Sequence, residues 1–90
     1  LTFKNFDEVI ERANDNDLGL CSYLYTNSMD KAHIGSEKLE TGCVAVNTGV
    51  VALAEAPFGG IKQTGYGREG GSGAIKDYLN VKYTHMGLKI

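Results

Sequence analysis

Apolar residues near the start of the chain recur with the period of a helix. They stand at positions i, i+3, i+4 and i+7 and are Phe6, Val9, Ile10 and Ala13. This spacing places them on one stripe of a helix over residues 6–16. Asn5 is a suitable N-cap for this helix, with Glu8 at the capping-box position. We therefore expect an amphipathic helix at the start of the chain.

A strand, a helix and a second strand are expected next. Leu20–Thr26 is an apolar and aromatic run typical of a buried strand. Ser28 can cap a helix that ends before Gly42, which stands in the usual position of a C-terminal glycine. Cys43–Val46 follows as a short strand. The order predicts an α/β fold with a βαβ crossover and parallel strands. Buried parallel strands need further strands beside them, so we expect one end of a larger doubly wound sheet.

The later part of the chain is rich in glycine. Residues 59–73 hold seven glycines in fifteen positions, so the backbone must adopt tight or positive-φ conformations or approach something closely. A third helix is expected over residues 72–79, with Ala74, Ile75, Tyr78 and Leu79 on its packed side. An extended segment over Val81–Met86 follows.

Chain length and charge narrow the classes of function. Ninety residues allow one domain with a modest core and exclude a large self-contained enzyme. Nine basic and eleven acidic side chains give a net charge of −2, which provides no positive patch for nucleic acid or an anionic membrane. No apolar run approaches the ~20 residues that cross a bilayer. We expect a cytoplasmic protein with no nucleic-acid or membrane partner.

The two cysteines are too few for a disulfide framework. Cys21 and Cys43 occupy apolar runs, where a reduced thiol packs as a small hydrophobic group, as suits a reducing cytoplasm. Neither His33 nor His85 is near enough in the sequence to suggest a base paired with a nucleophilic thiol. Structural thiols are therefore favoured over a catalytic cysteine, and the spacing predicts no metal site.

Part of the glycine-rich segment has the spacing of a dinucleotide-binding motif. Gly65–Gly70 matches G-x-G-x-x-G, in which glycines let the backbone approach a pyrophosphate at a helix N-terminus. The residues before it are not a buried strand, and the acidic ribose ligand expected about 20 residues downstream would fall at Ile90. A structural loop is favoured over a dinucleotide site, and no cofactor-binding residue is assigned.

The single proline of the chain stands directly before Phe58-Gly59-Gly60. Proline restrains the backbone, phenylalanine provides a rigid ring, and the two glycines leave the approach open. Composition alone gives two interpretations equal weight. The ring is either an anchor that holds a loop on the core or an aromatic wall of a ligand pocket.

A series of short motifs covers almost the whole chain. They are Ala13-Asn14, Leu18–Leu20, Tyr25-Thr26, Gly42–Asn47, Pro57–Lys62, Thr64–Gly70, Tyr78 and Lys82. In this order they resemble the C-terminal end of the aldehyde dehydrogenase superfamily. Asn47-Thr48-Gly49 and the ending Tyr78–Tyr83 are most similar to the succinate-semialdehyde dehydrogenase branch.

The resemblance implies a fold and an assembly. The family has an NAD(P)-binding domain, a catalytic domain and a small oligomerisation arm, in chains several times this length. Residues 1–80 would be the C-terminal part of the catalytic domain, and residues 81–90 would be the arm. The final strand, Val81–Leu88, would pair with the sheet of a neighbouring subunit and so build a homodimer or homotetramer.

The resemblance also implies a reaction. In the family a cysteine thiolate attacks a small aldehyde, hydride passes to NAD or NADP, and a glutamate activates water to hydrolyse the thioester. The motifs that carry these groups would precede Leu1, so the fragment would hold no catalytic residue and would be inactive alone. At matching positions Val50, Ala52 and Phe58 would face the substrate. The semialdehyde branch often has a serine at the position of Ala52, where its hydroxyl helps to hold the carboxylate of the substrate.

A second interpretation belongs to a different class of protein. The chain could be a stand-alone α/β interaction module without catalysis, whose glycine-rich loop and final strand dock onto a partner. Its amphipathic helices and exposed strand edges are compatible with self-association.

Overall fold

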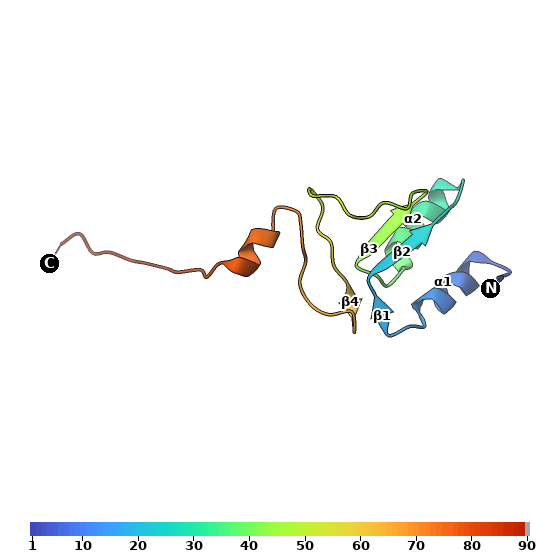
Figure 1. Cartoon of the computed structure of the whole chain (residues 1–90), viewed down its shortest axis with the longest axis horizontal. Coiled ribbons are helices and arrows are strands. Elements are labelled where there is room, and N and C mark those ends of the chain that lie inside the picture. The colour runs from blue at the N-terminus through green and yellow to red at the C-terminus, as the bar shows by residue number, and fades with distance from the viewer. Residues whose placement is uncertain (90) are drawn as a thin grey trace.

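The computed structural model describes residues 1–89, and Ile90 lies outside the described part (Figure 1). In chain order the elements are α1 (Phe6–Asn14), β1 (Leu18–Gly19), β2 (Cys21–Leu24), α2 (Met29–Lys38), β3 (Cys43–Val46), β4 (Ile61–Lys62) and the 3₁₀ helix η1 (Ala74–Tyr78). The first two predicted helices and the strand at Cys21 are confirmed with shorter bounds, and the strand at Cys43–Val46 is confirmed with the bounds predicted. The short strands β1 and β4 were not predicted.

Side-chain caps begin both α-helices. The Asn5 side chain accepts a hydrogen bond from the Glu8 N–H at 2.9 Å, as predicted. The Glu8 carboxylate accepts from the Lys4 N–H at 3.0 Å, one residue earlier than a standard capping box requires. Ser28 caps α2 by accepting from the Lys31 N–H at 3.3 Å. Local sequence therefore fixes where both helices begin.

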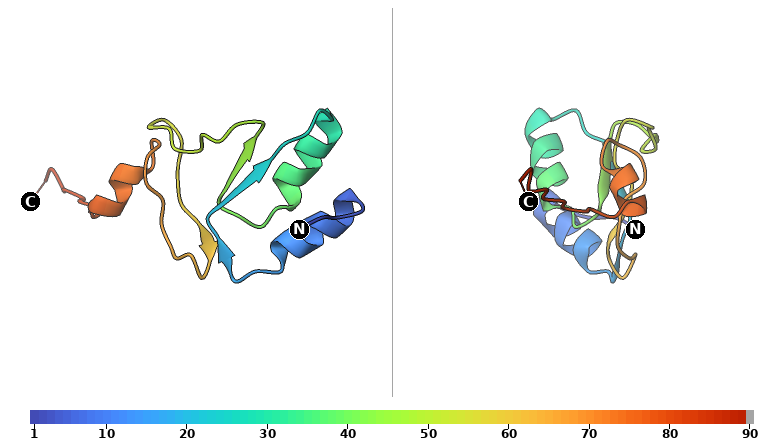
Figure 2. Two further views of the ribbon diagram at one scale, coloured as in Figure 1. Left: turned by 45° about the vertical axis from the view of Figure 1, so that its right-hand side comes forward. Right: turned by 90° about the vertical axis from the view of Figure 1, so that its left-hand side faces the viewer.

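Strands β2 and β3 form a parallel pair with α2 between them in the chain. The register runs from Cys21 opposite Cys43 to Leu24 opposite Val46. Helices α1 and α2 lie on the same side of this pair (Figure 2). Helix α2 packs closely on β2 there, since a Cβ added at Gly35 would lie 2.6 Å from a methyl carbon of Leu24.

A second pair of strands brings a distant segment back to the body. Strands β1 and β4 are antiparallel, with Gly19 opposite Ile61 and Leu18 opposite Lys62. The Gly19 N–H also donates to the Thr64 hydroxyl at 2.8 Å. The residues between β3 and β4 are therefore tethered at both ends.

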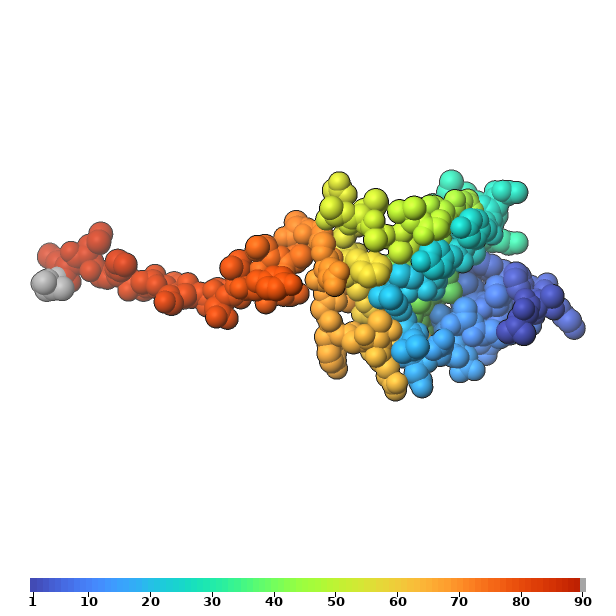
Figure 3. Space-filling model, in the orientation of Figure 1, coloured from blue at the N-terminus to red at the C-terminus, as the bar shows by residue number. Residues whose placement is uncertain are grey.

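The chain encloses little apolar volume. In the described residues only Ile10 and Ala45 are buried hydrophobic side chains. The radius of gyration is 19.1 Å, whereas a compact domain of this length has a radius of about 12 Å. Residues after η1 lead away from the body, so the molecule is 75 Å long (Figures 1 and 3). A larger sheet, as predicted from the crossover, would cover the apolar surface that is exposed here.

The C-terminal predictions differ from the structure. In place of a helix over residues 72–79 with a packed side, a 3₁₀ helix forms at Ala74–Tyr78, and Ile75, Tyr78 and Leu79 are exposed. The predicted segment Val81–Met86 is extended but pairs with no strand among the described residues (Figure 1), and its pairing with another subunit stays a prediction. An apolar helix face and an isolated strand both need a neighbouring surface, and the described chain offers none there.

Gly42 was predicted to follow α2 as its C-terminal glycine, and this is wrong. The helix ends at Lys38, and its C-cap Leu39 is extended. Gly42 instead lies against the backbone of Gly59, where an added Cβ would be 2.7 Å from the Gly59 carbonyl carbon. No side chain fits at this contact.

Within residues 1–89 no helix has the length and apolarity needed to cross a membrane.

Candidate functional site

The segment that carries the predicted substrate wall begins at the end of β3. Asn47 has a positive φ of 56° and turns the chain out of the sheet. Its side-chain oxygen accepts from the Thr26 N–H at 2.9 Å, and its side-chain nitrogen donates to the Thr26 carbonyl at 3.0 Å. The Asn47 amide thus pairs with backbone in the manner of a strand and fixes the start of the loop.

Phe58 is held by two short backbone hydrogen bonds. Its N–H donates to the Glu69 carbonyl and its carbonyl accepts from the Glu69 N–H, both at 2.7 Å. This antiparallel bridge folds the glycine-rich loop back over the Phe58 segment. The Phe58 side chain is half-buried and borders a pocket of about 340 Å³. A rigid backbone and a half-exposed ring are suited to forming a pocket wall.

The glycines beside Phe58 are required by close contacts. A Cβ at Gly59 would lie 2.6 Å from the Gly67 carbonyl, and a Cβ at Gly60 would lie 2.7 Å from the Thr64 Cβ. Larger residues at positions 59 and 60 would keep this segment apart from Thr64 and Gly67. The two glycines therefore serve close backbone packing, besides leaving the pocket open.

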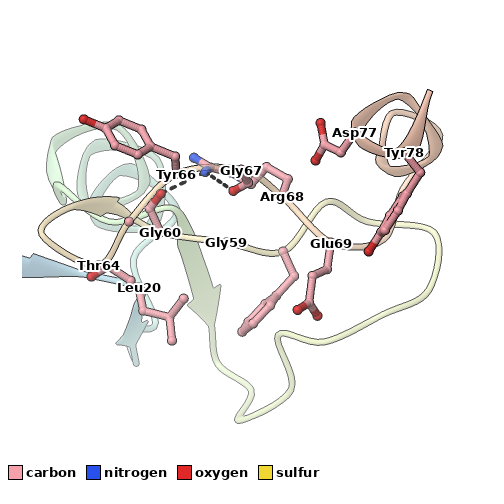
Figure 4. Close-up of a pocket in the computed structure, with 12 residues that line it drawn as sticks. Leu20, Gly59, Gly60, Thr64, Tyr66, Gly67, Arg68, Glu69, Asp77 and Tyr78 are labelled. Carbon is pink, nitrogen blue, oxygen red and sulfur yellow. Dashed lines mark hydrogen bonds between the residues drawn. The ribbon is translucent and has the colours of Figure 1, made fainter. Parts of the chain in front are cut away.

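Arg68 turns back into its own loop. Its Nη1 donates to the Gly60 and Gly67 carbonyls, both at 2.8 Å, and Figure 4 shows both hydrogen bonds. Asp77 and Tyr78 of η1 line the opposite side of the same pocket (Figure 4). The guanidinium thus holds the loop in shape by binding carbonyl oxygens.

The structure gives the Gly65–Gly70 motif a structural setting. The preceding β4 is only two residues long, and η1 begins at Ala74, four residues after the motif ends. Gly65, Gly67 and Gly70 have positive φ, and a Cβ at Gly70 would lie 2.7 Å from the Ala56 carbonyl. A pyrophosphate site places a helix N-terminus directly at this loop, so the later start of η1 favours the interpretation as a structural loop, which stays a prediction.

The predicted wall residues do not share a single pocket in the described chain. Val50 is exposed and borders a second pocket of about 280 Å³, together with Cys43 and Pro57. Ala52 lies between Val50 and Phe58 in the sequence. It is exposed and lines neither of the two pockets. The assignment of Val50, Ala52 and Phe58 to an aldehyde tunnel stays a prediction.

Sequence reasoning missed the role of Lys62. Its Nζ donates to the Asn14 and Asn16 carbonyls at 2.9 and 3.0 Å and forms a 2.7 Å ion pair with Glu40. Lys62 has a positive φ of 56°. The ammonium thus binds the end of α1 to the segment after α2. Its place within the glycine-rich segment 59–73 was the only signal in the sequence.

The cysteines and histidines form no nucleophile and base pair in the described chain. Cys21 and Cys43 are free and half-buried. His33 is exposed on α2, and His85 accepts or donates a 3.2 Å hydrogen bond with the Tyr83 hydroxyl in the C-terminal extension. No group of three or more metal-ligating side chains occurs among residues 1–89.

A family model now accounts for this arrangement. The model described as the aldehyde dehydrogenase family matches residues 1–84. The chain belongs to the aldehyde dehydrogenase family. The resemblance found in the sequence motifs is confirmed, and it covers both the β2–α2–β3 region and residues 47–60 between β3 and β4, the Phe58 loop.

Curated aldehyde dehydrogenases match most of the chain. A 3-sulfolactaldehyde dehydrogenase of Pseudomonas putida is 48% identical over 85 residues, which are 94% of this chain and 18% of that protein. A succinate-semialdehyde dehydrogenase [NADP(+)] of Escherichia coli is 45% identical over 86 residues, which are 96% of this chain and 18% of that protein. The chain thus spans less than a fifth of the length of these relatives.

A solved structure supports the fold. An NAD+ complex of an aldehyde dehydrogenase from Bacillus cereus matches with a TM-score of 0.90 and 42% identity, over 99% of this chain and 18% of that one. The α/β arrangement described above is therefore that of a segment of an aldehyde dehydrogenase, extension included.

Proposed function

We propose that the chain is the C-terminal part of an NAD(P)-dependent semialdehyde dehydrogenase and supplies one wall of its aldehyde tunnel. The held position of Phe58 carries this proposal, because two 2.7 Å backbone hydrogen bonds present a half-buried ring at the edge of a pocket. The nucleophilic cysteine, the water-activating glutamate and the main cofactor site would lie in the region of the enzyme that these residues do not include.

The proposed contribution to catalysis is positional. NAD or NADP, held mainly by the rest of the enzyme, would supply the hydride acceptor. Phe58, with Val50 and Ala52 on the same loop, would exclude water and orient the aldehyde toward the reacting groups. Positioning of this kind contributes several kcal/mol to catalysis when the geometry is held, roughly up to 7–11 kcal/mol in well-oriented model reactions. The bridge to Glu69 provides that rigidity.

The relatives support one class of substrate. They are named for aldehydes that carry an acidic group, either a sulfonate or a carboxylate. We propose succinate semialdehyde or a similar acidic aldehyde for this enzyme. Ala52 lacks the hydroxyl expected for holding a carboxylate, so affinity for that group would be lower than in relatives with serine.

Subunit contacts are the second proposed role. Val81, Tyr83, Met86 and Leu88 are exposed on an extended segment that leads away from the body. Apolar side chains on an unpaired, extended backbone suit pairing with a strand of another subunit. A homodimer or homotetramer is the assembly that this segment would support.

A hybrid enzyme tests the proposal. The matched segment of the Escherichia coli succinate-semialdehyde dehydrogenase is replaced by this chain, and reduction of NADP+ is followed with succinate semialdehyde. Turnover by the hybrid, with none by the isolated 90-residue chain, is the expected result. A soluble hybrid of native secondary structure and assembly without turnover would contradict the proposal. Aldehyde oxidation by the isolated chain above a boiled control would also contradict it.

A further inference from the structure

The two cysteines of the chain lie opposite each other in the parallel sheet. Cys21 begins β2, Cys43 begins β3, and the register pairs them directly. Opposed residues on neighbouring strands are about 4.7–4.9 Å apart and project to the same face. Disulfides join α-carbons that are about 4.4–6.8 Å apart. The backbone thus already holds these residues at a separation that a disulfide can bridge.

The surroundings of the two thiols favour their mutual contact. Both are free and half-buried. The Cys43 sulfur lies 3.8 Å from the Gly59 carbonyl oxygen. Burial, together with the charge and the hydrogen bond of Cys43, raises the pKa of the Cys21 thiol. A thiol-to-thiol hydrogen bond requires the sulfurs to be neighbours, in agreement with the strand register.

Neither thiol has a role in the function proposed above. Two positions 22 residues apart in the sequence carry the only cysteines, and the fold puts both on one rung of one sheet. We propose that Cys21 and Cys43 are a dithiol that hydroperoxides oxidise to an intrachain disulfide. The inference depends on strand pairing alone and not on aldehyde oxidation.

The chemistry balances with hydrogen peroxide as oxidant. One thiolate attacks a peroxide oxygen, the O–O bond breaks, and a sulfenic acid forms as hydroxide leaves and is protonated to water. The second thiolate attacks the sulfenic sulfur, the S–S bond forms, and the hydroxyl leaves as a second water. Two thiols lose two electrons and two protons, and one peroxide is reduced to two waters. A thiol reductant such as glutathione reverses the reaction by exchange.

Oxidation would alter the base of the Phe58 loop. A disulfide would tie the starts of β2 and β3 together and enclose α2 in a closed loop. It would also draw the Cys43 sulfur away from the carbonyl of Gly59, the residue that follows Phe58. The cysteine pair is therefore placed so that its oxidation would change the position of the predicted substrate wall.

Peroxide titration of the reduced hybrid enzyme tests the proposal, because the segment there lies within a complete sheet. Remaining thiols are alkylated, and mass spectrometry identifies a linked pair of tryptic peptides together with the loss of two hydrogens. A non-reducing gel separates the intrachain product from dimers. We expect a monomeric Cys21–Cys43 disulfide that forms at least about tenfold faster in buffer than in guanidinium chloride, where only chain diffusion brings the thiols together.

A double substitution provides the matched control. Cys21→Ser with Ser22→Cys keeps two cysteines at nearly the same spacing but moves one thiol to the opposite face of β2. This variant should oxidise at least about tenfold more slowly in buffer and match the parent chain in guanidinium chloride. Equal rates for parent and variant in buffer, equal rates of the parent in buffer and denaturant, or mainly intermolecular dimers would each overturn the proposal. The assay contains no aldehyde, so its failure leaves the proposed enzyme function untouched.

Discussion

The backbone of Gly59 lies directly against the α-carbon of Gly42. A Cβ added at Gly42 would collide with the Gly59 carbonyl and would lie 2.9 Å from the Gly60 α-carbon. The start of β3 and the Phe58 loop therefore touch backbone to backbone. This contact fixes the distance between the predicted substrate wall and the start of β3.

The first prediction concerns this contact. Gly42→Ala should lower the free energy of unfolding by about 1–3 kcal/mol, because the obstacle is backbone that cannot rotate away. Urea denaturation followed by circular dichroism measures the change. Gly49→Ala is the control, since nothing lies within 4 Å of its added Cβ. Equal stability of the two variants would refute the close contact.

Lys62 gives a second prediction. Lys62→Met keeps the aliphatic stem but removes the ammonium that binds the Asn14 and Asn16 carbonyls and Glu40. We expect a loss of about 1–2 kcal/mol in the free energy of unfolding, because the substitution removes a charged donor and leaves its acceptors without a partner. High salt should weaken the parent chain more than the variant.

The control for Lys62 is a second lysine, Lys76 of η1, which makes none of these contacts. Lys76→Met removes an equal charge from η1, where no ion pair of Lys76 is recorded among the described residues. Its free energy of unfolding should stay within about 0.5 kcal/mol of the parent. A loss as large as that of Lys62→Met would show that net charge, and not the Lys62 contacts, decides the effect.

The Cys21 thiol gives a prediction about pH. Burial and the neighbouring Cys43 thiol raise its pKa above the ordinary value of 9.0. The folded chain therefore holds this proton more tightly than the unfolded chain, so its contribution to stability is complete below pH 9.0 and is lost as the pH rises through the folded pKa. Urea titrations of parent and Cys21→Ser between neutral and alkaline pH measure it. The difference between them should change above that pH and stay flat below it, and a flat difference throughout would refute the shift.

Local patterns predicted the N-terminal half well. Asn5 and Ser28 mark helix starts through short-range hydrogen bonds, and such caps can be recognised from neighbouring residues alone. The strands at Cys21 and Cys43 are likewise short apolar runs bounded by turns. Their parallel pairing was predicted, but the register that places Cys21 opposite Cys43 was not, because register depends on contacts between distant parts of the chain.

The missed features all depend on tertiary contacts. Gly42 has the sequence context of a helix C-cap, but its small size is needed for the approach of Gly59. The lysine at position 62 looks like a surface charge until β4 pairs with β1 and carries it to the end of α1. The C-terminal segment has strand composition, but a strand needs an edge to pair with. Phe58 was selected as a candidate because a single proline and two glycines flank it, and its role in the site stays a prediction.

Substrate choice can be tested at position 52 of the hybrid enzyme. Ala52→Ser should restore a hydroxyl for the distal carboxylate and lower the KM for succinate semialdehyde about tenfold, since a hydrogen bond to a charged group contributes about 1.5–3 kcal/mol. The KM for an uncharged aldehyde of similar length should not change. Ala54→Ser, on the same exposed loop, is the control and should leave both values unchanged. A fall in KM for both aldehydes would argue against recognition of the carboxylate.

The central claim is that the Phe58 loop is a wall of the aldehyde site, and one substitution in the hybrid enzyme tests it most directly. The measurement is kcat/KM for succinate semialdehyde with Phe58→Ala, beside Phe3→Ala at an exposed ring near the N-terminus. Removal of a positioning wall should lower kcat/KM roughly tenfold to a hundredfold, with unchanged assembly and unfolding midpoint, while Phe3→Ala stays at the level of the unsubstituted hybrid. A folded Phe58→Ala hybrid that keeps full kcat/KM would contradict the account.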